Sequence, residues 1–255
     1  MSDQQDFEAL LPKLKAMDKK ALRKQDMPME QAVNEGAIMA TAASQDADAL
    51  KAVGLDGSVI TELGASVNAL RYAQGQYVAA IGELKDASKQ WATEEPQAYA
   101  LRDDLLSAMS FGLRKVPDAV KAVRRIREGS GGADMIQDLS ALAQLGKKYP
   151  GELKTINFDA GLLDQATEKA GNLGQLYAKA FVEKGTADAK DLRDRAFSYM
   201  RAVMSEVLDA AEYAFRKDKT KLDYYYSTYR SRQSSSSAKP EPAPAAAAQT
   251  SATAK

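Results

Sequence analysis

Residues 188–216 read DAKDLRDRAFSYMRAVMSEVLDAAEYAFR, and this stretch decides the fold class of the chain. It contains no glycine or proline, and its apolar residues recur at spacings of three, four or seven, which place side chains on one face of an α-helix. Two neighbouring apolar rows result: Leu192, Ala196, Met200, Val203 and Val207 in one, and Phe197, Met204, Leu208, Ala211 and Phe215 in the other. Two adjacent rows make a wide apolar face, so we expect this helix to lie inside a bundle rather than along its edge.

The same helical spacing recurs in the stretches before it. We expect further helices over residues 29–53, 59–89, 96–117, 133–146 and 160–184. Glycine costs about 1 kcal/mol relative to alanine inside a helix, so Gly64, Gly75 and Gly82 are expected at close contacts with another helix. The sequence TEEP, with Thr93 as N-cap, is expected to begin the helix that contains Pro96.

Glycine and proline mark the breaks between these helices. Gly54 predicts one helix end, and Pro117 must kink or end another. The glycines of residues 129–132 are interpreted as a helix stop and linker. A phosphate-binding loop would require a preceding strand and a following Lys-Ser or Lys-Thr. A short strand over residues 153–158 has no evident pairing partner. The sequence therefore predicts an all-α, antiparallel bundle of long helices.

The tripeptide LRD occurs at residues 101–103 and again at 192–194. In the same register Met109 matches Met200, and Val116 matches Val207. Two readings stay open. The core is either a pair of pseudo-repeated helical hairpins, or amphipathic helices that share residues through composition alone.

Composition bounds the function. Lys plus Arg and Asp plus Glu both number 35, and this zero net charge argues against a dedicated nucleic-acid binder. The chain has no cysteine and no histidine, which excludes thiolate chemistry, histidine-based triads and the usual zinc sites. We therefore expect a non-catalytic protein without cofactor or metal. An enzyme using only carboxylates, Lys, Tyr or Arg has no specific residues to support it.

Domain limits follow from changes in composition. Residues 1–27 are expected to form a loosely attached arm with one or two short helical turns, and residues 28–232 the helical bundle. Residues 233–255 are rich in Ser, Pro and Ala without a large apolar residue, so we expect a disordered tail. The polar N-terminus lacks an apolar signal region, and no run reaches the roughly 18 apolar residues that a membrane span needs. We expect a cytoplasmic protein.

Two segments are candidates for partner contact. Residues 114–127 are basic, with Lys121, Arg124 and Arg125 as candidate contacts. Residues 217–232 mix basic residues with four candidate tyrosines: Tyr224, Tyr225, Tyr226 and Tyr229. If this segment is helical, one tyrosine row packs on the bundle and another faces outward as a contact surface. The other reading, which the sequence favours slightly, is that all four tyrosines pack on the bundle. The first hypothesis is binding of an unknown protein partner or self-association. The alternative is binding of an acidic partner, either nucleic acid or an anionic membrane surface.

Overall fold

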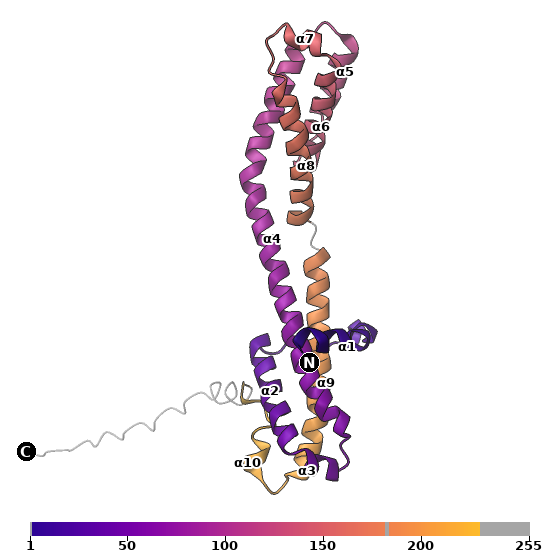
Figure 1. Cartoon of the computed structure of the whole chain (residues 1–255), viewed down its shortest axis with the longest axis vertical. Helices are drawn as coiled ribbons and strands as arrows, with labels where there is room; N and C mark the ends of the chain where they lie inside the picture. The colour runs from indigo at the N-terminus through magenta and orange to yellow at the C-terminus, as the bar shows by residue number, and fades with distance from the viewer. Residues whose placement is uncertain (1, 182–183, 230–255) are drawn as a thin grey trace, which may run out of the picture. The chain divides into compact units, whose positions relative to one another are not determined.

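A computed structural model describes residues 2–181 and 184–229 of the chain. Over these residues the regular elements are helices and none is a strand, which confirms the all-α prediction (Figure 1). None of the helices in these two ranges is long and apolar enough to cross a membrane. The predicted tail, residues 233–255, lies outside the described residues.

The chain divides into two compact units. Unit 1 comprises residues 1–71 and 194–255, and unit 2 comprises residues 72–193. Both boundaries fall within long helices, α4 (Gly57–Gly112) and α9 (Lys184–Ala214), so each of these helices contributes to both units. The predicted domain limits of 28 and 232 remain predictions, because a compact unit and an independently folding domain are different properties.

Unit 1 is organised around the C-terminal part of α9. Of the two predicted apolar rows, all but Leu192 and Leu208 are buried, which confirms the wide apolar face. Helix α2 (Met29–Gln45) approaches it at Gly36. A Cβ atom at Gly36 would lie 2.8 Å from Val67 Cγ2 and 2.9 Å from Met200 Sδ. Helices α2, α4 and α9 therefore meet at this glycine.

Helix α1 (Asp3–Ala16) packs on unit 1 more closely than the sequence indicated. We expected one or two short turns in a loose arm, but the structure has a 14-residue helix with a capping box at Ser2 and with Phe7, Leu10 and Leu14 buried. The physical reason lies far away in sequence. Arg195 Nη1 donates to the carbonyls of Leu14, Lys15 and Met17 at 3.0, 3.3 and 2.6 Å, which satisfies the C-terminal end of α1.

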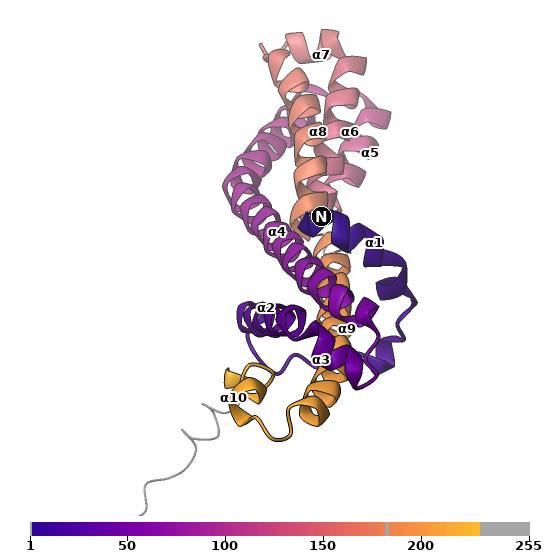
Figure 2. The same cartoon turned by 60° about the horizontal axis from the view of Figure 1, so that its bottom comes forward.

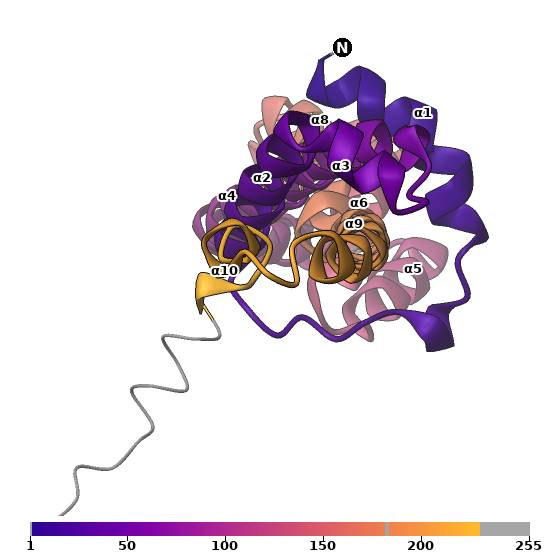
Figure 3. The same cartoon turned by 90° about the horizontal axis from the view of Figure 1, so that it is seen from below.

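Short elements complete unit 1. The 3₁₀ turn η1 (Lys19–Ala21) follows α1, and α3 (Ala47–Ala52) follows α2, so the single helix predicted over 29–53 is divided at Asp46. Gly54, at φ 100°, ends this region as predicted. Helix α10 (Lys219–Leu222) is labelled in Figure 3. Its Lys221 forms an ion pair with Asp46, the residue that follows the last residue of α2.

Unit 2 combines the second part of α4 with α5 (Pro117–Arg127), α6 (Gly132–Lys148), α7 (Pro150–Lys154) and α8 (Gly161–Phe181). Helices α6 and α8 run antiparallel, joined through α7 (Figures 1 and 2). A Cβ at Gly146 would lie 2.5 Å from Leu163 Cδ2, so these helices are in close contact. The fully buried members of the core include Leu105, Met109, Leu113, Leu139 and Leu142.

Two expectations for α4 were wrong. No new helix begins at Thr93, since α4 continues through Pro96 and Thr93 Oγ1 donates to Lys89 O at 3.1 Å instead of capping. Trp91 and Ala98 are buried on either side of Pro96, and this packing outweighs the lost backbone bond. Gly64, Gly75 and Gly82 have nothing within 4 Å of a built Cβ, so they are not sites of close helix contact.

The predicted break between α5 and α6 in unit 2 is confirmed. Helix α5 ends at Arg127 and α6 begins at Gly132, with Gly131 at φ 103°, which confirms the glycine linker. Residues 153–158 do not form the strand that the sequence allowed. These residues form the end of α7 and a turn in which Asn157 takes a φ of 54°.

The structure gives the two LRD copies different surroundings. After the first copy, α4 ends at Gly112 and a new helix begins at Pro117. After the second copy, α9 runs without interruption to Ala214. The matched positions Val116 and Val207 therefore lie in an extended linker and in a helix interior, which favours shared composition over duplicated hairpins.

Candidate functional site

The tyrosine segment, residues 224–229, follows α10 and divides into an inward and an outward part. Tyr225 is 1% exposed, stacks on Phe215 with ring centroids 5.9 Å apart, and donates its hydroxyl to Asp46 Oδ2 at 3.1 Å. Burial, followed by the nearby Asp46 carboxylate, raises the pKa of the Tyr225 hydroxyl. Tyr225 is therefore a packing residue that holds the segment against the rest of unit 1.

Tyr224 and Tyr226 face outward. They are 59% and 47% exposed, although both residues belong to a segment that is tightly held on either side. The Tyr226 hydroxyl donates to Glu212 Oε1 at 3.1 Å, and this bond is the main cause of its raised pKa. The predicted division into packing and outward tyrosines is thus present, but it arises in a turn after α10 and not along a helix.

Glu35 of α2 anchors the far end of the segment. Its Oε1 accepts hydrogen bonds from Ser227 Oγ and from the Tyr229 backbone N–H, both at 2.9 Å. The residue is only 7% exposed, and its second oxygen, Oε2, is buried and has no hydrogen-bond partner within residues 2–181 and 184–229. Tyr229 therefore contributes through its backbone, while its side chain is half-buried.

A groove of about 1090 Å³ lies between the tyrosine segment, α2 and α9, and we call it the tyrosine groove. Ile38, Met39, Met204 and Leu208 supply its apolar walls, together with the three consecutive tyrosines. Glu35 lines it as a buried acid. The other charged lining residues are Arg23, Arg201 and Asp223.

The basic candidates lie in unit 2, apart from the tyrosines in unit 1. Lys121, Arg124 and Arg125 are exposed on α5, whose opposite face buries Ala119 and Val123. Lys121 Nζ lies 3.9 Å from Asp118 Oδ1 in a solvent-exposed pair, which contributes little to stability. The structure therefore places the two predicted contact segments in separate units.

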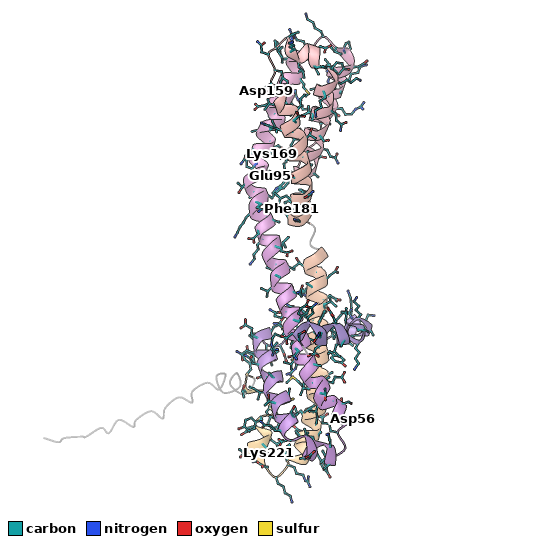
Figure 4. All side chains as sticks on the ribbon, in the orientation of Figure 1. Asp56, Glu95, Asp159, Lys169, Phe181 and Lys221 are labelled. Carbon is teal, nitrogen blue, oxygen red and sulfur yellow. The ribbon has the colours of Figure 1, made fainter. Side chains whose placement is uncertain are left out.

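Unit 2 has a second groove, of about 930 Å³, between α4 and α8. Lys169 Nζ bonds Glu94 Oε2 at 2.9 Å and Gln97 Oε1 at 3.3 Å, and Lys169 is labelled in Figure 4. At the end of α8, Phe181 is 54% exposed and joins Trp91 and Tyr177 in an edge-packed cluster. Most residues that line this groove are polar, and Lys169 is already paired.

Within residues 2–181 and 184–229, no group of three or more acidic side chains is arranged to hold a metal ion. Comparisons with protein-family models, curated proteins and solved structures found no match to this chain.

Sequence reasoning identified the tyrosine segment but missed Glu35 and Asp46, to which it is attached. A signal for Glu35 existed, because it directly precedes Gly36 and the small or apolar residues of positions 37–40. Asp46 offered none, because an acid at the end of a helix is ordinarily solvated.

Proposed function

We propose that this chain is a non-catalytic, cytoplasmic helical protein that binds another protein, or a second copy of itself, through the tyrosine groove. The observation that supports this is the rim of the groove, where Ile38, Tyr224 and Tyr226 are exposed together. Grouped, exposed apolar side chains mark interaction surfaces, and tyrosine is among the residues that contribute most to binding energy.

The anchoring of the tyrosine segment supports the same proposal. Lys221 and Tyr225 are bonded to Asp46, and Ser227 and the Tyr229 N–H are bonded to Glu35, so Tyr224 and Tyr226 each lie between two attached residues. A binding surface that is already ordered loses less conformational entropy when a partner binds. The backbone that carries Tyr224 and Tyr226 is therefore ordered before a partner binds.

Single substitutions test this proposal. Tyr224→Ala and Tyr226→Ala should each reduce quantitative affinity capture of partners, or shift the self-association equilibrium, by about tenfold. Tyr213→Ala is the matched control, because Tyr213 is 62% exposed in the same unit but does not line the groove. Unchanged capture and self-association in both groove variants, with melting temperatures equal to the parent, would rule the groove out.

A second candidate function rests on α5. Lys121, Arg124 and Arg125 are exposed together there, and such a row suits an acidic surface. Replacing all three with Gln should remove binding to DNA or anionic vesicles, and the parent's binding should weaken steeply with salt. The zero net charge of the chain makes this the weaker candidate.

A further inference from the structure

The end of α4 and the following α5 form a strongly basic surface in unit 2. Residues 111–128 carry six basic and two acidic side chains, although the net charge of the chain is zero. The six basic residues are all exposed: Arg114, Lys115, Lys121, Arg124, Arg125 and Arg127. Within residues 2–181 and 184–229, the side chains of Lys115, Arg124 and Arg125 form no ion pair. Positive charge that the chain itself does not neutralise favours an anionic ligand.

One row of these basic side chains leads to an exposed aromatic ring. Lys121, Arg124 and Arg127 follow one another at spacings of three, which place them on one face of α5 over about 9 Å of helix. At the end of this row Arg127 Nη2 donates to Ser110 Oγ at 3.0 Å. Ser110 directly precedes Phe111, whose side chain is 58% exposed. The basic row and the ring of Phe111 therefore belong to one surface.

Phe111 forms a flat platform together with Arg114. The guanidinium carbon of Arg114 lies 4.1 Å from the centre of the Phe111 ring, and Arg114 Nη1 donates to the Phe111 carbonyl at 2.5 Å. Both side chains are exposed, so the pair does not belong to the core. Aromatic rings and guanidinium planes are the groups on which unpaired nucleic-acid bases stack.

The packing of α5 argues against a membrane as the anionic partner. Ala119 and Val123 are buried, and Val116 and Ile126 pack against the same core cluster. A helix that lies on a membrane inserts its apolar face among the lipid chains. The apolar face of α5 is occupied by unit 2, so this helix offers a membrane only charge.

We propose that this surface binds single-stranded nucleic acid, with phosphates along the row of Lys121, Arg124 and Arg127 and a base stacked on Phe111. The inference rests on the second candidate function, an acidic partner for α5, and names that partner. A single strand supplies a phosphate and an unpaired base in every nucleotide. The bases of a duplex are already stacked on one another, and an acidic peptide supplies charge without a base.

Fluorescence anisotropy of labelled oligothymidylate and oligouridylate, each of about 12 nucleotides, tests this with the full chain. We expect binding that weakens steeply with salt and is about tenfold tighter than binding to a DNA duplex of the same length. Binding of either strand supports the inference, and the tighter one identifies the ligand as DNA or RNA. Equal or tighter binding of the duplex, of polyglutamate or of anionic vesicles would overturn the inference and leave the second candidate function standing. If none of these anions is bound, both fail.

Two variants separate stacking from charge. Phe111→Ala should lower the affinity for the single strand about tenfold without changing its salt dependence. Arg124→Gln should instead reduce the slope of log affinity against log salt by about 0.7, the value for one phosphate contact. Tyr213→Ala is the matched control, because Tyr213 is 62% exposed and carries Arg216 on its ring, but belongs to unit 1. Its affinity should equal that of the parent.

Unchanged affinity in Phe111→Ala would overturn the stacking of a base on this ring. Phe111→Leu keeps an apolar side chain without the aromatic ring, and decides the same question if the alanine variant does not fold. The protein-binding function of the tyrosine groove is tested separately, by Tyr224→Ala and Tyr226→Ala.

Discussion

Unit 1 assembles from two stretches of sequence, residues 1–71 and 194–255, whereas unit 2 is one continuous stretch, residues 72–193. Their buried polar residues differ accordingly. Unit 1 buries Asp6, Glu35, Ser66, Arg195 and Ser198, while unit 2 buries Asp138 and Arg193. Several of the buried groups in unit 1 bind a remote segment, as Arg195 binds the end of α1 and Ser198 accepts from the Arg23 N–H.

The difference shows two ways of completing a helical unit. Unit 2 has a large cluster of buried aliphatic side chains supplied by helices that follow one another along the chain. Unit 1 adds short segments with few apolar residues of their own, such as residues 18–27 and 223–229, and fixes them with directed polar bonds. Because such bonds specify position, unit 1 is the better frame for a defined binding surface.

The largest effect is expected where the two units are alike. Met200→Asp in unit 1 and Leu139→Asp in unit 2 each place a carboxylate at a position that is fully buried. Each should lower the free energy of unfolding by about 4 kcal/mol or more, measured by chemical denaturation with circular dichroism. Met200→Leu, a volume-conserving control, should cost less than about 1.5 kcal/mol. If either Asp variant had the same melting temperature as the parent, the helix that carries the substitution would not belong to the core of its unit.

The next effect should separate the units. Arg195→Met removes the donor to three carbonyls at the end of α1 and should cost about 3 kcal/mol, with loss of amide protection in α1. Arg216→Met is the control, since Arg216 is exposed and contacts nearby Tyr213, through its carbonyl and its ring, instead of a remote segment. If α1 kept its protection without Arg195, the polar anchoring of unit 1 would be wrong.

Two glycines in unit 1 give opposite expectations. Gly36→Ala forces its Cβ against Val67 and Met200 and should destabilise by about 1–3 kcal/mol. Gly64→Ala meets nothing within 4 Å and should stabilise by up to about 1 kcal/mol, because alanine favours the helix. Thermal melts of the two variants check this contrast, and a shift in the same direction for both would contradict the close approach at Gly36.

The smallest effect concerns acid stability. Glu62 of α4 bonds Lys13 of α1 and Tyr199 of α9, and the Lys13 bond is the main cause of its lowered pKa. A carboxyl group whose pKa is lower in the folded state adds stability above its unfolded pKa, and this stability is lost as pH falls. Glu62→Gln should therefore cost less than about 1 kcal/mol at pH 7. It should also lose less stability than the parent below pH 4.5, the ordinary pKa of the group. Parallel pH–stability curves for parent and variant would refute this.

The sequence predicted those features that local patterns control. Short local patterns were enough to predict four features: the apolar rows of α9, the helix end at Gly54, the break before Pro117 and the glycine linker. The continuation of α4 through Pro96 was not readable, because it depends on packing of Trp91 and Ala98. The packing of α1 and the anchoring of the tyrosine segment depend on Arg195 and Glu35, which are more than 175 residues away from their partners along the chain.

Hydrogen exchange of the full chain, with and without the partner whose capture depends most on Tyr224, tests the central claim most directly. We predict that binding slows exchange in residues 33–40 and 222–229, which border the tyrosine groove in unit 1, and leaves α5 of unit 2 unchanged. Slowed exchange confined to α5, over Pro117–Arg127, would contradict the account and assign partner binding to the basic helix.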